Sequence, residues 1–364
     1  MPAASSTCMD YAPPPGTLLE ETLETIDISA RELARRCGRS AKLITEILSA
    51  KAPLEPETAL QFERVLGIGA SIWLGMEAAY RLHEARKVDD KNFADYIPWA
   101  RSFPLADLHK RGKLPSAQAN AETVKSLLEF FGVASVKACE DYCDSYGVAY
   151  RHSQRYDSNR QSVFAWLRIG ELEAATITCD DYDRSKLISA LETLRTVTTV
   201  SEPRLFIPRI KAELASAGVA FVIEKSLANI ALSGISRWLS PRKALIQQTC
   251  RHMADDHFWF TLFHEAAHIL LHSRKSVFVE GKGDTSGTAA EEDEANAWAA
   301  NFLIPRAALS NFINAGEFTL SSIRRFAHAQ EVAPGIVVGQ LQKAGEVGWN
   351  SFLNKLKVRY EWKN

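Results

Sequence analysis

Asp256–Leu271, DHFWFTLFHEAAHILL, is the stretch that decides the fold. It is apolar on nearly every side apart from a few polar residues, which predicts a helix buried all round. Within it, His264 and His268 stand four residues apart, so both imidazoles project from one face, about one turn from each other. Asp255 or Asp256 is expected to cap the N-terminus of this helix.

Two histidines and a glutamate inside such a helix need partners, because unpaired polar groups are costly to bury. A metal ion satisfies all three, and Glu265, next to the first histidine, can then act on a metal-bound water. The alternative is a pair of core histidines hydrogen-bonded to backbone carbonyls. With two histidines and one carboxylate the preferred ion is Zn²⁺, one per chain, although Mn²⁺ or iron fits the same ligand types.

A third ligand is expected from the downstream segment Thr288–Ile304, TAAEEDEANAWAANFLI, which predicts a second helix. Glu292 and Asn296 stand four apart on one face, so Glu292 would bind the metal and Asn296 would support a ligand histidine. Glu291 and Glu294 are alternatives, but Glu294 points about 200° away from Glu292 around the helix. His272 continues the row of His264 and His268, yet we expect it one turn beyond the metal, where a cation suits the helix dipole.

In the expected chemistry, the metal lowers the pKa of its water and polarises the scissile carbonyl. Glu265 would accept the proton of that water and pass it to the leaving amine. The stretch 273–287 connects the two helices and, with Gly281, Gly283 and Gly287, predicts a flexible loop or hairpin.

The two motifs together, HEAAHILLH followed by EEDEANAWAANFLIP, resemble the active-site signature of the ImmA/IrrE family of zinc metallopeptidases. The resemblance implies a zincin-like fold with His264, His268 and Glu292 as ligands and Glu265 as the catalytic residue. It also implies cleavage of helix-turn-helix repressors, which switches on stress-response or mobile-element genes. The matching positions are Glu292, Glu294, Ala295, Asn296, Ala299, Leu303 and Pro305, and the departures are exchanges of apolar residues at Ala266, Trp298, Phe302 and Ile304.

A second motif, Ala30–Ser49, has the spacing of a helix-turn-helix. Ala34 is small where the two helices would cross, and Gly38 supplies the turn. Ser29 and Glu32 have the spacing of a capping box, and Ser40 could cap the second helix. The positions expected on the inward faces are Leu33, Cys37, Ile44 and Ile47.

The same segment is locally basic, since 28–52 holds six Lys/Arg against two Glu. This surplus suits phosphate contacts, and the exposed face of the second helix would enter the major groove. A helical bundle used for protein contacts is the alternative, because fold alone does not fix function. The residues predicted to contact operator DNA are Arg39, Ser40, Lys42, Thr45, Ser49 and Lys51.

Thr17–Ala85 as a whole resembles the lambda-repressor-like domains of the XRE and HigA antitoxin group, on the run APLEPETA at 52–59 followed by Trp73-Leu74. The resemblance implies five short helices. It also implies binding of a palindromic operator as a homodimer.

Composition limits the other classes of function. The net charge of −1 argues against a protein that coats nucleic acid or a membrane surface, so DNA contact must be local. The six cysteines form no CxxC pair, which favours reduced thiols in a cytosolic protein. With neither a signal peptide nor eighteen consecutive apolar residues, we expect a cytoplasmic protein without a membrane partner.

We therefore predict a mainly α chain with a small β-sheet. It consists of a disordered arm at 1–16, a helix-turn-helix domain at 17–86, a helical linking region at 87–216 and a metallopeptidase domain at 217–364. Strands are expected at 218–225, 229–239 and 243–249, and they offer an edge to an extended peptide substrate. Further helices are expected at 123–131, 162–177, 185–197, 205–217, 321–330 and 335–342.

The leading interpretation is a DNA-binding regulator that carries its own zinc-dependent endopeptidase, with a helix-turn-helix repressor as protein substrate. The alternative is an antitoxin-like transcriptional repressor whose metal site is structural or sensory. An intact Glu265 argues against the alternative, because a purely structural zinc needs no general base and tends to be closed by four protein ligands.

Overall fold

The computed structural model describes residues 11–145, 159–249, 254–272 and 289–360. The described chain is mainly helical with one small mixed sheet, which confirms the predicted fold class. Contacts divide the chain into two compact units, residues 1–97 with 120–122 and residues 98–119 with 123–364. The predicted connecting loop at 273–287 and most of the predicted arm lie outside the described residues.

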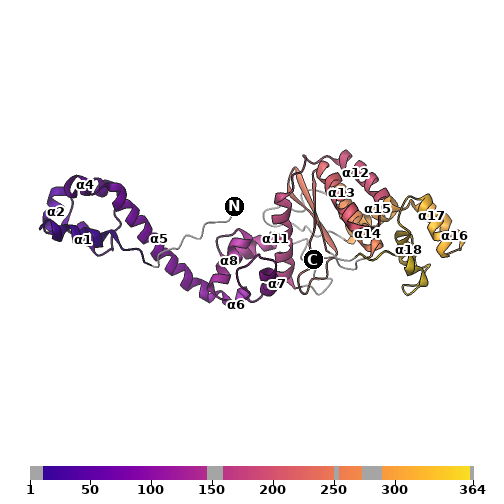
Figure 1. Ribbon diagram of the computed structural model, residues 1–364, viewed down its shortest axis with the longest axis horizontal. Coiled ribbons are helices and arrows are strands. Elements are labelled where there is room, and N and C mark those ends of the chain that lie inside the picture. Colours follow the sequence, from indigo (N-terminus) through magenta and orange to yellow (C-terminus); the bar gives the residue numbers. More distant parts are fainter. Residues whose placement is uncertain (1–10, 146–158, 250–253, 273–288, 361–364) are drawn as a thin grey trace. The chain divides into compact units, whose positions relative to one another are not determined.

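The first unit is a helical bundle (Figure 1). Its first helix begins two residues before the predicted domain start. The fifth helix has 26 residues, so the expectation of five short helices is wrong for this one. The helices are α1 (Pro15–Thr25), α2 (Ala30–Cys37), α3 (Ala41–Leu48), α4 (Pro56–Leu66) and α5 (Ala70–Asp95).

The helix-turn-helix of this bundle is α2 and α3. Gly38 lies between them at φ 65°, in the left-handed region that glycine adopts at low cost. The Ser40 side chain caps α3 by accepting from the Leu43 amide, as predicted. All four predicted inward residues are buried, and Ala34 with them; their relative exposures are Leu33 0%, Ala34 3%, Cys37 6%, Ile44 0% and Ile47 1%.

Only half of the predicted capping box forms. The Ser29 hydroxyl accepts from the Glu32 amide, as a helix N-cap does. The Glu32 carboxylate instead pairs with Arg35 and Arg36, one turn further along α2. Two guanidinium groups outcompete a single backbone N–H for this carboxylate, because charge-assisted hydrogen bonds are the stronger ones.

The second unit contains the sheet. Its strands are β1 (Val219–Ile223), β2 (Gly234–Ser240) and β3 (Lys243–Gln248), in the order β1-β3-β2. Strand β3 runs parallel to β1 and antiparallel to β2, so β2 lies at an edge. The surrounding helices are α6 (Ile97–Ala100), α7 (Leu105–Lys110), α8 (Ala121–Phe131), α9 (Val136–Ser145), α11 (Arg160–Thr176), α12 (Arg184–Val197), α13 (Pro203–Ser216), α14 (Asp255–Leu271), α15 (Ala289–Leu303), α16 (Arg306–Ala315), α17 (Leu320–Ala329) and α18 (Pro334–Lys343), with a short 3₁₀ helix at Phe352–Leu356.

Helices cover both faces of the sheet, so β1 and β3 are buried on both sides, whereas β2 at the edge is half-buried (Figure 1). Successive side chains of a strand point to opposite faces. Ala220, Val222 and Leu245 pack with Ala174 of α11. Their neighbours along the strands join the core that contains α13 and α14. The result is a helix–sheet–helix sandwich with α14 on the face opposite α11.

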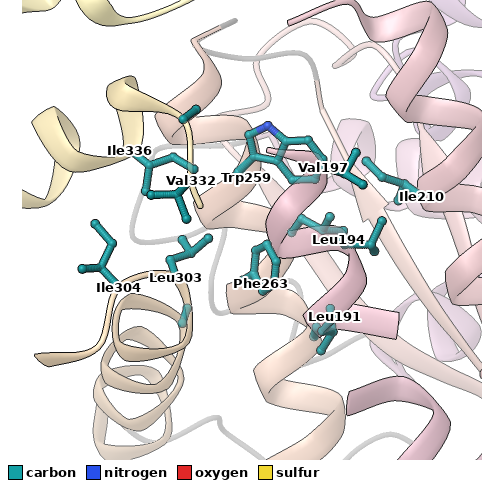
Figure 2. Close-up of a cluster of buried hydrophobic side chains, with 14 of the residues drawn as sticks. Leu191, Leu194, Val197, Ile210, Trp259, Phe263, Leu303, Ile304, Val332 and Ile336 are labelled. Carbon is teal, nitrogen blue, oxygen red and sulfur yellow. The ribbon is translucent and has the colours of Figure 1, made fainter. Parts of the chain in front are cut away.

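One hydrophobic core holds α12, α13, α14, α15 and α18 together (Figure 2). Leu191 and Leu194 of α12 belong to the same buried cluster as Phe263 of α14, which is one residue before His264. Residues 184–216, predicted as part of a linking region, therefore pack in the same unit as the helix that carries the two histidines. Burial of large side chains such as Phe263 stabilises by about 1.5–3 kcal/mol each.

The N-terminus of α14 is held by the end of the chain rather than by a side-chain cap. Ala254 is the capping residue and makes no side-chain hydrogen bond, so the prediction that Asp255 or Asp256 caps the helix is wrong. Both aspartates instead lie buried in its first turn. The Asp255 amide donates to the Val358 carbonyl, and Lys357 Nζ lies 2.6 Å from Asp256 Oδ2.

The buried Asp255 carboxylate gives a pH-dependent contribution to stability. Burial, and then the charge of Asp256, raise the pKa of Asp255 to about 7. The folded state thus holds this proton more tightly than the unfolded chain, so stability is lost as pH rises towards 7. Asp255→Asn removes this loss, and we expect its stability advantage over wild type to grow by about 2–3 kcal/mol between pH 5 and pH 8.

Denaturant unfolding of both proteins at pH 5, 6, 7 and 8 measures this difference. Lys357 and Asp256 are the same in both proteins, so the comparison isolates the effect of the Asp255 carboxylate on the free energy of unfolding. A difference that stayed level over this range would contradict the raised pKa.

Candidate metal centre

Two helices bring the candidate ligands together. On α15, Glu292, Ala295 and Ala299 recur at helical spacing and so share one face. Both alanines are fully buried, and their small side chains allow α15 to approach α14 closely. Because Glu292 lies one turn before these alanines, packing of the two helices carries its carboxylate to the histidine face of α14.

The carboxylate of Glu292 lies between the two imidazoles. Its oxygens are 3.5 Å from His264 Nε2 and 3.4 Å from His268 Nε2, and the two Nε2 atoms are 3.1 Å apart. Ligands at tetrahedral zinc, with bonds of about 2.0–2.1 Å, are separated by about 3.3 Å. The three residues therefore fit a zinc ion in both type and spacing. They form the group of potential metal ligands found among the described residues.

The negative charges of Glu265 and Glu292 favour a cation at this site. Burial lowers the pKa of His264, but the hydrogen bond that its ring donates to the Glu292 carboxylate, the negative charges of Glu265 and Glu292 and the hydrogen bond with the Asn296 side chain outweigh burial, so the pKa is raised. Asn296 thus hydrogen-bonds to His264, and its predicted support of a metal ligand stays a prediction. A divalent ion between these residues would take over the role of the proton.

Glu265 lies on the same helix and is only 6% exposed. Its Oε2 accepts a hydrogen bond of 3.0 Å from the Ser236 hydroxyl on β2. Gly234, two residues earlier, allows this approach, because a Cβ there would stand 2.7 Å from Thr261 and 3.1 Å from Glu265. Ser236 is not predictable from the sequence, because a serine in a short strand carries no signal of the helix that it will face.

The remaining polar neighbours lie outside the ligand group. His272 Nδ1 is 2.9 Å from His268 Nδ1, on the side of that ring away from Glu292. Glu294, the weaker of the predicted alternatives to Glu292, is 62% exposed in its side chain and lies 3.4 Å from His272 Nε2. Glu291 is half-buried. The structure thus brings together His264, His268 and Glu292 and leaves Glu294 at the surface.

Some of the residues predicted to contact DNA are exposed, and others are engaged in hydrogen bonds within the domain. Lys42, Thr45, Ser49 and Lys51 are exposed on or after α3. Arg39 instead donates to Gln61 Oε1 and Glu57 Oε2, which ties it to α4. The Ser40 hydroxyl serves as the α3 cap. The exposed part of the predicted set therefore lies along α3 and just beyond it.

Among the described residues, no helix is both long and apolar enough to cross a membrane. A family model described as the IrrE N-terminal-like domain, of the peptidase M78 family, matches residues 238–337. This range begins in β2 and includes all of α14 and α15, and so contains both histidines and Glu292.

The chain is also similar to two curated proteins. It is 35% identical over 78 residues to the uncharacterized HTH-type transcriptional regulator YddM of Escherichia coli (strain K12), covering 21% of this chain and 83% of that protein. It is 36% identical over 85 residues to virulence-associated protein I of Dichelobacter nodosus, covering 23% of this chain and 78% of that protein. The resemblance to both a peptidase family and a class of regulators, inferred from the sequence motifs, is confirmed.

Proposed function

Because this chain belongs to the HTH-type transcriptional regulators and contains an IrrE N-terminal-like domain of the peptidase M78 family, we propose that it is a DNA-binding regulator with a zinc-dependent endopeptidase. Its substrate is a protein of the helix-turn-helix repressor type. The observation that carries the proposal is the convergence of His264, His268 and Glu292 beside a buried glutamate that is not one of them. A structural zinc site would have no use for that glutamate.

In this proposal, His264 and His268 hold the ion through Nε2, and Glu292 holds it through its carboxylate. A bound zinc ion supplies a Lewis acid that lowers the pKa of water and polarises a peptide carbonyl. Glu265 accepts the proton of the attacking water and delivers it to the leaving amine. The Ser236 hydroxyl, bonded to Glu265 Oε2, holds the carboxylate in one orientation.

Strand β2 is suited to hold the substrate. It is an edge strand, and among the described residues no further strand pairs with its outer side. Ser236 joins this strand directly to Glu265. An extended peptide added to β2 by main-chain hydrogen bonds would thus lie next to the proposed general base.

For the regulator module, we propose that α3 enters the major groove of operator DNA and that the protein acts as a homodimer. Lys42 has a side chain that is 82% exposed and lies 3.7 Å from Glu46, too loosely paired to prevent a phosphate contact. Thr45 is exposed on the same helix, and Ser49 is exposed at its C-cap. Arg39, held by α4, and the cap Ser40 would act by fixing the entry of α3, and Lys51 adds charge after it.

Removal of the metal tests the peptidase proposal. The purified full-length chain, loaded with one equivalent of zinc, is incubated with purified helix-turn-helix repressors, and cleavage is followed by mass spectrometry. A chelator is expected to abolish cleavage, because without the ion neither the water nor the carbonyl is activated, and zinc is expected to restore it. Cleavage that continued in the metal-free protein would contradict the proposal.

Substitution on α3 tests the DNA proposal. We expect Lys42→Ala and Thr45→Ala each to weaken binding to the upstream region of the protein's own gene by about 1–3 kcal/mol, and Lys42→Ala also to reduce the salt dependence. Glu20→Ala, on exposed α1 surface, serves as the matched control. Fluorescence anisotropy at several salt concentrations measures both effects. Unchanged affinity in both α3 variants would contradict the assigned groove face.

A further inference from the structure

The ring of His268 is contacted from both sides. Its Nε2 atom faces the metal centre, 3.1 Å from His264 Nε2 and 3.4 Å from Glu292 Oε1. Its Nδ1 atom lies 2.9 Å from Nδ1 of His272, the residue that follows Leu271 and caps the C-terminus of α14 in an extended conformation. Since the two nitrogens of an imidazole point away from each other, His272 lies behind His268 as seen from the metal centre.

The short distance between the two Nδ1 atoms, together with metal binding at His268 Nε2, decides which of them carries a proton. One of the two nitrogens must donate and the other must accept, because two lone pairs or two N–H groups would repel each other at this distance. A metal-binding His268 needs its Nε2 lone pair for the ion, so its proton resides on Nδ1. His268 is therefore the donor and His272 Nδ1 the acceptor. This in turn places the proton of the neutral His272 ring on its Nε2.

The outer end of this arrangement is acidic. His272 Nε2 is buried without a hydrogen-bond partner among the described residues, and Glu294 Oε2 lies 3.4 Å from it, within ion-pair distance. The His272 side chain is only 11% exposed, whereas that of Glu294 is 62% exposed. The carboxylate thus faces the N–H end of the ring but is well solvated, and its influence is the weaker of the two contacts.

We propose that His272 is a positioning residue, which holds His268 in the tautomer and ring orientation required for metal binding, with Glu294 as its outer partner. The inference rests on the proposed metal site and extends it by one layer. Metal-bound histidines commonly donate their second N–H to an acceptor, and loss of that acceptor lowers metal affinity about 10–100-fold. His272 is not a fourth ligand, because its contact with His268 is through the atom opposite the metal centre.

Metal affinity, rather than proteolysis, provides the test. The metal-free full-length chain and its variants are titrated with zinc in competition with a chromophoric chelator. His272→Phe keeps a flat ring but removes the acceptor, and we expect zinc binding about 10–100-fold weaker. His272→Asn can place an amide oxygen where Nδ1 lies, and we expect affinity within about threefold of wild type. Glu294→Gln is expected to change affinity less than about threefold, because the carboxylate is solvated.

His257→Phe is the matched control, since it makes the same exchange at an exposed position on the same helix. Wild-type affinity in His272→Phe, or equal weakening in the phenylalanine and asparagine variants, would overturn the inference, because the second result would mark a packing role. A wild-type chain that binds no zinc would instead refute the proposed metal site itself.

A second measurement decides the question even where His272→Phe does not fold. In the zinc-loaded wild-type chain, nitrogen-15 chemical shifts distinguish a protonated from an unprotonated ring nitrogen. We expect a proton on Nδ1 of His268 and on Nε2 of His272. A proton on Nδ1 of His272 would overturn the inference.

Discussion

Replacing Glu265 by glutamine is expected to lower the rate of peptide hydrolysis by about 10²–10⁴-fold while the zinc content stays at the wild-type level. The amide cannot accept the proton of the attacking water, so the loss falls on the chemical step. Its remaining oxygen can still accept from the Ser236 hydroxyl, so the packing of α14 against β2 is retained. Metal analysis and single-turnover cleavage of the same preparations measure the two quantities.

Ser236→Ala is the companion variant. It leaves the carboxylate in place and removes only its hydrogen bond, so we expect a smaller loss than for Glu265→Gln. If wild type and Glu265→Gln cleaved a repressor equally fast, Glu265 would have no part in proteolysis. If neither cleaved any repressor while both bound zinc and DNA, an antitoxin-like repressor with a structural or sensory metal would be the better description.

Gly218→Ala is expected to destabilise the second unit by about 3 kcal/mol or more. Gly218 leads into β1 with φ 81°, where a side chain is strained. A Cβ there would also stand 2.3 Å from the Tyr182 Cα, a backbone atom that cannot turn aside. The backbone around Tyr182 and Gly218 is held in place by two hydrogen bonds. The Tyr182 amide donates to the Arg242 carbonyl, and the Ala244 amide donates to the Gly218 carbonyl.

Gly345→Ala separates the two causes. Gly345 has φ 82°, but nothing lies within 4 Å of the Cβ that alanine would add. We expect this variant to lose only about 1–2 kcal/mol, the cost of the left-handed conformation. Chemical denaturation of both variants measures the difference. Equal losses would mean that the contact with Tyr182 relaxes without cost.

The local elements were largely predictable because they are determined by nearby residues. The helical periodicity of apolar residues predicts α11, α12 and α13. The observed bounds of these helices differ from the expected ones by at most two residues. Long-range packing was not predictable in this way. Nothing near Asp255 indicates that Val358 and Lys357, about a hundred residues later, will hold the start of α14. The parallel pairing of β1 with β3 is likewise a property of the whole sheet.

The candidate metal site likewise combines features that follow from local sequence with features that depend on long-range packing. His264 and His268 are recognisable because four residues make about one helical turn, and Glu292 because it stands four residues before Asn296 and so shares a helix face with it. The spacing of His272 from His268 predicts a residue at the helix end, but not its contact with His268 Nδ1, because that contact depends on the orientation of both rings. Ser236 needed the sheet and the helix to be placed together before its contact with Glu265 could be seen.

If the proposed peptidase holds its substrate on β2, the edge position of this strand would affect the rate at which protein targets are cleaved. A substrate that pairs with this strand must present several consecutive residues in an extended conformation. The first unit of this chain is a packed bundle of helices, and the proposed helix-turn-helix targets would be folded bundles of the same kind. Such a domain would have to open locally before it could be cut, so its lifetime would follow how often it unravels rather than how tightly it docks. Ligands or operator DNA that keep a target folded would then shield it.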